Sequence, residues 1–242
     1  MNKHKITAIN RNKLMALFLF CSLFSLAQFH DGETLLKAMH DKYAGKYCQT
    51  VVFDQKTLRY DTNHAVKDTS YWYEWISYPD KFRIDFGKKY GGNCVIFKND
   101  SSYSYRNHKL VKVSADENDL LLLLGGMYFR KFEEVEARLK KAGYQIKRLK
   151  SLPVSAGNLY VLGNDTTPQV WIDKTDLKVV KLKTKLSEKD WLEIMFYDFV
   201  KSCEGFTETK VTAKKNGKLE QMEEYLNLKT GVAIPDSIFN KK

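Results

Sequence analysis

Short segments in which apolar and polar residues alternate constrain this 242-residue chain most strongly. In residues 81–86, Phe82, Ile84 and Phe86 alternate with charged residues, so one face of the segment is apolar. A period of two residues is typical of a β-strand with one face away from water. The segments 94–98 and 102–106 follow closely and are separated by a polar turn. We therefore expect a meander of short antiparallel strands.

Two segments follow the period of a helix instead. In residues 32–43, Leu35, Leu36 and Met39 recur at helical spacing, and a second amphipathic pattern covers residues 132–142. Each pattern ends near a glycine.

Strand patterns resume after the second helix. They begin at residues 144–149 and continue to 191–199 and 206–212, and an Asn-Gly hairpin signal then precedes 219–228. About ten or eleven strands with two or three helices predict a single α+β domain. The expected architecture is a long, curved antiparallel sheet with helices on one side.

The N-terminus has the pattern of a secretory signal peptide. A basic region is followed by an apolar run from Leu14 to Leu26, and Ser25 and Ala27 place small residues before a cleavage point at Gln28. The prediction is that residues 1–27 are removed and that residues 28–242 form an exported, periplasmic domain. The apolar run is too short for an ordinary membrane helix, which needs about 20 residues.

The chain is basic, with 40 Lys and Arg against 29 Asp and Glu. A basic excess can indicate nucleic acid, but an exported protein rarely meets any, and the lysines are scattered. We expect no nucleic-acid partner. An anionic membrane surface and an ordinary soluble basic face remain as alternatives.

Three cysteines follow the predicted leader: Cys48, Cys94 and Cys203. An oxidising compartment permits one disulfide with one thiol left over, whereas the apolar context of each cysteine favours buried thiols. The pairing stays open. No Cys/His cluster with metal-ligand spacing occurs, so no metal site and no cofactor are expected.

A search for catalytic motifs finds none of the usual nucleophile, metalloprotease or nucleotide-binding patterns. His108 is an isolated histidine, and acidic residues on strands, such as Glu74 and Asp85, usually belong to a solvated sheet face. The sequence predicts that the protein is not an enzyme. An exported hydrolase remains the weakest alternative, because carboxylate spacing in sequence does not reveal separation in space.

Bulky side chains occur on both faces of one predicted strand. Tyr71, Tyr73 and Trp75 share one face, and Trp72 and Ile76 share the other. A sheet with one solvated face needs only one apolar face, so either the chain covers both faces or the concave face is an apolar chamber for a ligand with acyl chains. A leucine run, residues 120–124, precedes two glycines and suits either a core helix or a lid with a flexible hinge.

These segments resemble a known family. The run Pro79-Asp80-Lys81-Phe82-Arg83, the strand at 95–98 with its Asn99-Asp100 turn, the aromatic Tyr103-Ser104-Tyr105, and residues 169–174 are similar to patterns of LolA/LolB-type lipoprotein carriers. The chain departs from them at Tyr78, where the family usually has an arginine associated with holding the lid, and at Asn99-Asp100, where it usually has Asp-Gly.

The resemblance implies an unclosed (half) β-barrel wrapped around lid helices, with an apolar interior that receives acyl chains of lipoproteins. It further implies an inner-membrane releasing complex and an outer-membrane acceptor as partners, and we expect a monomer. A sensor or assembly module of the envelope on the same scaffold is the alternative. The candidate chamber residues are Tyr73, Trp75, Phe82, Ile84, Phe97, Tyr103 and Tyr105; the candidate lid residues are Leu121, Leu122, Leu124 and Met127.

Overall fold

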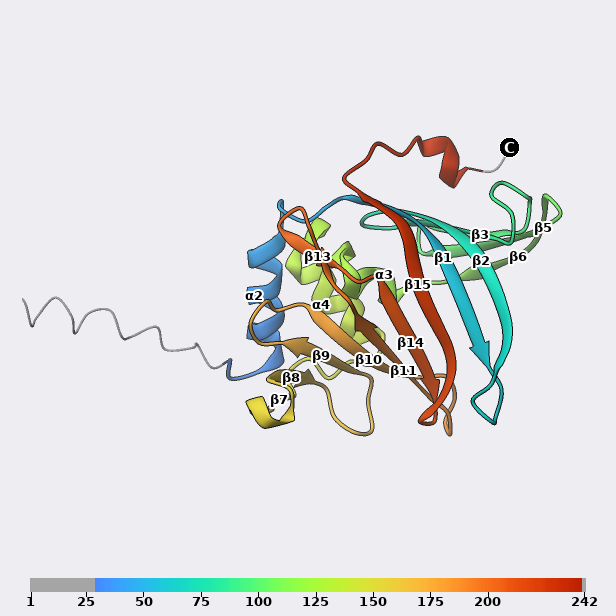
Figure 1. Ribbon diagram of the computed structural model, residues 1–242. Helices are drawn as coiled ribbons and strands as arrows, with labels where there is room; N and C mark the ends of the chain where they lie inside the picture. Colours follow the sequence, from blue (N-terminus) through green and yellow to red (C-terminus); the bar gives the residue numbers. More distant parts are fainter. Residues whose placement is uncertain (1–28, 241–242) are drawn as a thin grey trace, which may run out of the picture. The chain divides into compact units, whose positions relative to one another are not determined.

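The computed structural model describes residues 29–240 (Figure 1). The predicted signal peptide and its cleavage point lie outside these residues. The first helix, α2 (Gly32–Tyr43), begins where the Asp31 side chain accepts a hydrogen bond from the backbone N–H of Thr34 at 2.8 Å, as an N-cap does. Its apolar side buries Leu35, Leu36 and Met39 completely. The predicted helix is confirmed at both ends.

One antiparallel sheet of thirteen strands dominates the fold, in the order β6-β5-β4-β3-β2-β1-β15-β14-β11-β10-β9-β8-β7. The strands of its first half are β1 (Thr50–Tyr60), β2 (Val66–Ser77), β3 (Lys81–Phe86), β4 (Cys94–Lys98), β5 (Ser101–Arg106) and β6 (Lys109–Ala115). Those of its second half are β7 (Leu149–Ser151), β8 (Leu159–Leu162), β9 (Gln169–Asp173), β10 (Val179–Lys185), β11 (Trp191–Tyr197), β14 (Lys210–Lys215) and β15 (Lys218–Thr230).

The order shows two meanders joined by the pairing of the first strand with the last. Along β1, Gln55 lies opposite Tyr225 and Thr57 opposite Glu223 of β15. The connection between the meanders contains α3 (Asp119–Leu124), the 3-10 helix η1 (Gly126–Phe129) and α4 (Phe132–Lys141). A further 3-10 turn, η2 (Val154–Ala156), links β7 to β8.

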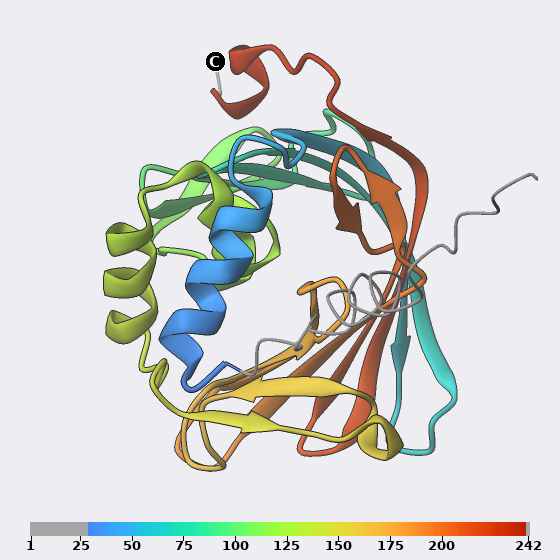
Figure 2. The same cartoon turned by 90° about the vertical axis from the view of Figure 1, so that its left-hand side faces the viewer.

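The sheet curves around the helices and does not close. Figure 2 shows the strands wrapping the interior, with α2, α3 and α4 lying in the opening between the two ends of the sheet. Arg138 of α4 holds this arrangement at one edge, because its guanidinium contacts the Asp100 carboxylate in the β4–β5 turn at 2.7 Å. The predicted α+β half-barrel is confirmed.

The strand count exceeds the expected ten or eleven, in part because one predicted strand is divided and another short strand lies just before it. The strand predicted at 191–199 ends two residues early. β11 stops at Tyr197, and the next residue, Asp198, has a positive φ of 52°. The chain then forms a separate two-stranded ribbon, β12 (Val200–Ser202) and β13 (Gly205–Thr207), before β14 rejoins the sheet. The segment 206–212 is therefore split at Glu208. The strand expected at 144–149 is wrong: only Leu149 belongs to β7.

A disulfide joins the ribbon to the start of the sheet. Cys48, just before β1, pairs with Cys203 in the β12–β13 turn, with 5.4 Å between the Cα atoms. The expectation of buried thiols is therefore wrong for Cys48 and Cys203. The β12–β13 ribbon places Cys203 next to Cys48, which lies just before β1. Cys94 lies outside the disulfide and is buried.

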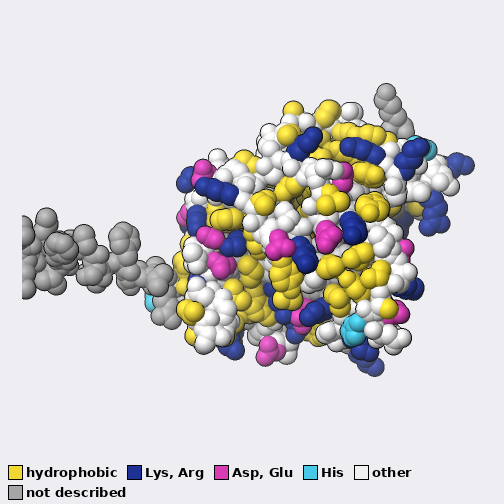
Figure 3. Space-filling view, viewed as in Figure 1, with side chains coloured by type: hydrophobic (Ala, Val, Ile, Leu, Met, Phe, Trp, Pro, Cys, Tyr) yellow, Lys and Arg dark blue, Asp and Glu magenta, His cyan; other side chains and the backbone are white. Residues whose placement is uncertain are grey.

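The outward face of the central strands is charged as well as apolar. Figure 3 shows Lys, Arg, Asp and Glu side chains interspersed among hydrophobic ones over this face. Lys56 of β1 and Glu224 of β15 lie opposite each other and form an ion pair of 3.7 Å. Within residues 29–240, the helices are too short or too polar to cross a membrane.

Candidate functional site

A cavity of about 190 Å³ lies between the inner face of the sheet and α3. Its sheet side is built by β1, β2, β3 and β15, and its other side by α3 and the end of β13. The apolar lining residues are Val51, Phe53, Trp72, Ile76, Phe82, Ile84, Leu120, Leu121 and Leu124; the others are Tyr47, Gln55, Glu74, Tyr78, Asn118, Thr207, Glu208, Glu223 and Tyr225.

The apolar wall results from strand register. Ile76 of β2 lies opposite Phe82 of β3, and Glu74 lies opposite Ile84, so these side chains share the inner face. On β1, Phe53 stacks on Tyr225 of β15 with 3.9 Å between ring centroids. Alternation along each strand therefore places one apolar row against the cavity.

The helix α3, which contains three of the predicted lid residues, begins at a specific cap. The Asn118 side chain accepts a hydrogen bond from the Leu121 backbone N–H at 2.9 Å, and Asn118 has a left-handed φ of 47°, a conformation that asparagine tolerates. Leu121 and Leu124 then line the cavity, while Leu122 and Leu123 are buried away from water.

Tyr78 holds the end of this helix. Its hydroxyl donates a hydrogen bond to the Leu124 carbonyl at 3.3 Å, and its ring stacks on Phe129 at 5.9 Å. The single hydroxyl proton of Tyr47 can be donated to either of two carbonyl oxygens, that of Leu124 at 2.9 Å or that of Phe206 at 2.7 Å. The position at which the resembled family carries an arginine is thus occupied by a tyrosine that contacts the lid.

The two glycines after α3 are closely packed. A Cβ atom on Gly125 would lie 2.4 Å from Cζ of the Tyr78 ring, and one on Gly126 would lie 2.9 Å from the Pro79 carbonyl oxygen. The absence of a side chain at Gly125 is therefore required by the approach of Tyr78. The predicted free Gly-Gly hinge is in this structure a tight contact point.

Three carboxyl groups also line the cavity, from Glu74 on β2, Glu208 after β13, and Glu223 on β15. Glu74 is 4% exposed and Glu208 is 8% exposed. Burial raises the pKa of Glu208 to about 7 and that of Glu74 well above its usual range. Burial also raises the pKa of Glu223, although Gln221, Tyr225 and Gln55 donate hydrogen bonds to its carboxyl.

The structure divides the predicted chamber residues. Phe82 and Ile84 line the cavity, and Phe97 lies beside it, with its ring 5.5 Å from that of Phe82. Of the predicted lid residues, Leu121 and Leu124 line the cavity, whereas Leu122 and Met127 are buried in the surrounding packing.

The remaining four residues lie on the opposite face of the sheet. Tyr73, Trp75, Tyr103 and Tyr105 belong to a cluster with Cys94 and Ile96, so their assignment to the chamber is corrected. Their strands do alternate as predicted, but the concave face is the one that carries Trp72 and Ile76. Alternation separates the two faces of a strand without telling which face is concave.

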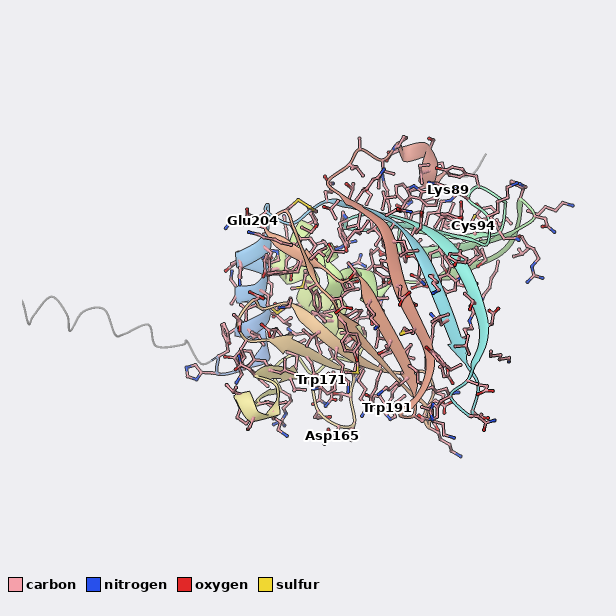
Figure 4. The ribbon with its side chains drawn as sticks, in the orientation of Figure 1. Lys89, Cys94, Asp165, Trp171, Trp191 and Glu204 are labelled. Carbon is pink, nitrogen blue, oxygen red and sulfur yellow. A yellow bond between two sulfur atoms is a disulfide. The ribbon has the colours of Figure 1, made fainter. Side chains whose placement is uncertain are left out.

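The C-terminal segment covers this outer cluster. The 3-10 turn η3 (Asp236–Phe239) buries Phe239 to 2% exposure, and the Arg83 guanidinium donates to the Ile238 carbonyl at 2.9 Å and to the Asp85 carboxylate at 2.8 Å. Figure 4 shows Lys89 and Cys94 on the side of the sheet nearest this turn. Both aromatic faces of β2 are thus covered, one by the lid and one by the chain end.

The acidic lining is not predicted by the sequence. Glu74 is expected on a solvated face, but it alternates with Trp72 and Ile76 and therefore points into the cavity. Asp85 points to the other face. The sequence signal was a carboxylate inside an otherwise aromatic and apolar row. His108 lies in the β5–β6 turn and does not line the cavity, and among residues 29–240 there is no His, Cys, Asp and Glu cluster suited to a metal ion.

No family model matches the sequence, and no curated protein matches it. Several solved structures are similar to the structure of this chain. A structure from Vibrio parahaemolyticus described as an outer membrane lipoprotein-sorting protein domain has a TM-score of 0.61 at 11% identity, covering 87% of this chain and 96% of that one. A LolA superfamily protein from Nitrosomonas europaea has a TM-score of 0.55 at 11% identity, covering 87% and 98%.

A DUF1329 family protein from Desulfovibrio piger is also similar, with a TM-score of 0.54 at 14% identity, covering 86% of this chain and 95% of that one. At identities this low, the structural similarity establishes the fold alone. The chain has the fold of LolA-type proteins over most of its length, which confirms the architecture that the sequence resemblance implied.

Proposed function

We propose that this chain, which has the LolA-type fold, is a periplasmic carrier that binds an apolar ligand between its curved sheet and α3. The observation that carries the proposal is the cavity, whose lining includes nine apolar side chains and the rings of Tyr47, Tyr78 and Tyr225. The similarity of the chain's fold to a lipoprotein-sorting domain makes lipoprotein acyl chains the first cargo to test.

The size of the cavity suits a carrier whose lid is closed. Ligand pockets usually measure about 300–1,000 Å³, whereas this cavity measures about 190 Å³. Movement of α3 away from the sheet would add the volume now filled by Leu121 and Leu124. A leucine lid that returns when the cargo leaves competes with the cargo, which limits affinity and permits release.

The physical driving force is burial of methylene groups. Each contributes roughly 0.8 kcal/mol on leaving water, so a long acyl chain gains on the order of 10 kcal/mol. This mode of binding requires no covalent chemistry at the cavity. An inner-membrane releasing complex and an outer-membrane acceptor are the partners that such a carrier would need.

The test is to express the chain with its natural N-terminus, purify it from the periplasm without detergent, and examine it by native mass spectrometry and lipid extraction. We expect a co-purified apolar ligand, or displaceable binding of a fluorescent apolar probe. Ile84→Trp, which fills the cavity, should reduce binding. Val66→Trp, at an exposed position of β2, is the matched control. Absence of ligand and of probe binding would exclude the carrier function.

Two other functions predict different results. For a sensor or assembly module, depletion of the protein should change transcription without accumulating lipoproteins in the inner membrane. The three cavity carboxyls favour an exported hydrolase as a second candidate, since paired carboxyls can act as acid and base. That function would require turnover of a glycoside that is abolished by Glu74→Gln or Glu208→Gln.

A further inference from the structure

The three cavity carboxyls face a wall without positive charge. Among the described residues that line the cavity there is no lysine, arginine or histidine. Glu74 is 4% exposed, and its pKa is raised by burial and by the like charges of Glu223 and Glu208. The Glu208 carboxyl is hydrogen-bonded by its own backbone N–H, and within residues 29–240 neither carboxyl forms an ion pair. Glu74 is therefore a buried polar side chain without a protein partner that points into a cavity.

Such groups are costly unless something compensates for them. A buried carboxylate lacking hydrogen bonds or a counter-charge destabilises the protein, and nearby carboxylates repel one another. The neighbouring hydroxyls do not relieve Glu74 or Glu208, because those of Tyr47 and Tyr78 donate to backbone carbonyls. Glu74 and Glu208 thus face the cavity without a side-chain donor or a cation beside them in the described residues, and a ligand could supply either.

We propose that the cavity binds an amphiphile whose polar end is an amine, held by Glu74, Glu208 and Glu223, and whose alkyl end packs against Ile76, Phe82, Ile84 and α3. The proposal rests on the proposed carrier function and specifies its ligand class. An ammonium group supplies charge and three hydrogen-bond donors, and charge-assisted hydrogen bonds are about twice as strong as neutral ones.

The charge distribution of the chain supports this choice. The formal charge of +11 falls to +7 when the four basic residues of the predicted leader are subtracted, yet the charged groups that line the cavity are all acidic. An anionic amphiphile attracted to the basic exterior would meet carboxylates inside, whereas an amine finds its complement there. A divalent metal ion is a poorer occupant, because the described residues contain no suitable cluster of metal ligands.

The probes for this proposal are octylamine, octanol and octanoate, which share one alkyl chain and differ in the polar end. A short chain is appropriate, because the cavity of about 190 Å³ is smaller than the roughly 300–1,000 Å³ of usual ligand pockets. Each probe is titrated at pH 7.5 against the purified chain by displacement of a fluorescent apolar dye. Octylamine should bind roughly tenfold or more tightly than octanol, a difference of about 1.4 kcal/mol.

The double variant Glu74→Gln/Glu208→Gln should abolish the preference for octylamine over octanol. Glu220→Gln, at an exposed position of β15, should keep it. Equal binding of all three probes to the unmodified chain would overturn the amine proposal but leave the carrier function intact. A preference that persists in the double variant would also overturn it. Failure of every probe to bind would overturn both.

Discussion

The hydroxyl of Tyr78 donates a hydrogen bond to the carbonyl of Leu124, and the Tyr78 ring occupies the space that a side chain on the next residue, Gly125, would need. One tyrosine at the start of the β2–β3 turn thereby holds the C-terminal end of the lid helix. Lid position and the identity of residue 125 are therefore coupled through a single ring.

This coupling is measurable by a double-mutant cycle. Gly125→Ala places a Cβ atom 2.4 Å from the Tyr78 ring, so we expect a loss of about 1–3 kcal/mol in the free energy of unfolding and stronger binding of an apolar dye as the lid is displaced. In a Tyr78→Ala background the same substitution should cost much less, because the ring is absent. Denaturant unfolding of the four proteins gives the coupling energy. Additive effects would refute the contact.

Stability should depend on pH through Glu208. Burial raises its pKa to about 7, whereas an unfolded glutamate titrates near 4.3. The folded protein holds the proton more tightly between these values, so the free energy of unfolding should fall as the pH rises from about 4.5 to 7, by on the order of 3 kcal/mol. Thermal melts from pH 4.5 to 8 should show a falling Tm.

Glu208→Gln should flatten that dependence, since the amide does not titrate. The raised pKa values of Glu74 and Glu223 have the same sign and leave a residual slope. Glu220→Gln is the control for removing one acidic residue at an exposed site. If both variants follow the unmodified protein, the burial of Glu208 is not the source of the pH dependence.

The Cys48–Cys203 disulfide should contribute to stability, because it closes a loop with a sequence separation of 155 residues. Reduction, or the variant Cys48→Ser/Cys203→Ser, should lower the free energy of unfolding by about 2–4 kcal/mol. Urea unfolding with and without reductant measures this loss. A reductant should have no further effect on the double variant, and an effect there would place the sensitivity elsewhere.

The C-terminal turn should be part of the folded core. Phe239 is 2% exposed within the outer aromatic cluster, so Phe239→Ala should cost about 3–5 kcal/mol. Val154→Ala, at a position 80% exposed, should change stability by less than about 0.5 kcal/mol. Equal unfolding midpoints for these two variants would show that residues 232–240 do not cover the sheet in solution.

Local patterns predicted the elements where one signal dominates. The helix at 32–43 combines apolar spacing with a glycine after its end, and the strand 81–86 shows period-two alternation. The strands 94–98, 159–162 and 169–173 are short segments rich in apolar residues. Their bounds match the structure because no tertiary contact competes with the local preference.

Tertiary contacts determine the strand break and the concave face, which local patterns do not predict. The break at Glu208 arises because the β12–β13 ribbon leaves the sheet and is joined by a disulfide to Cys48, a partner 155 residues away. The concave face of β2 could not be chosen from the sequence, since Tyr73 and Trp75 look as suitable for a core as Trp72 and Ile76. What distinguishes the faces is the covering by Phe239 on one side and α3 on the other.

The sheet ends in two strands, β6 and β7, that pair on one side only in residues 29–240. A closed barrel has a girth fixed by its strand number and stagger. Here the circumference is completed by helices, so the molecule can widen around bulky contents when side chains slide at the contacts between helices and sheet, while all twelve strand pairings stay intact.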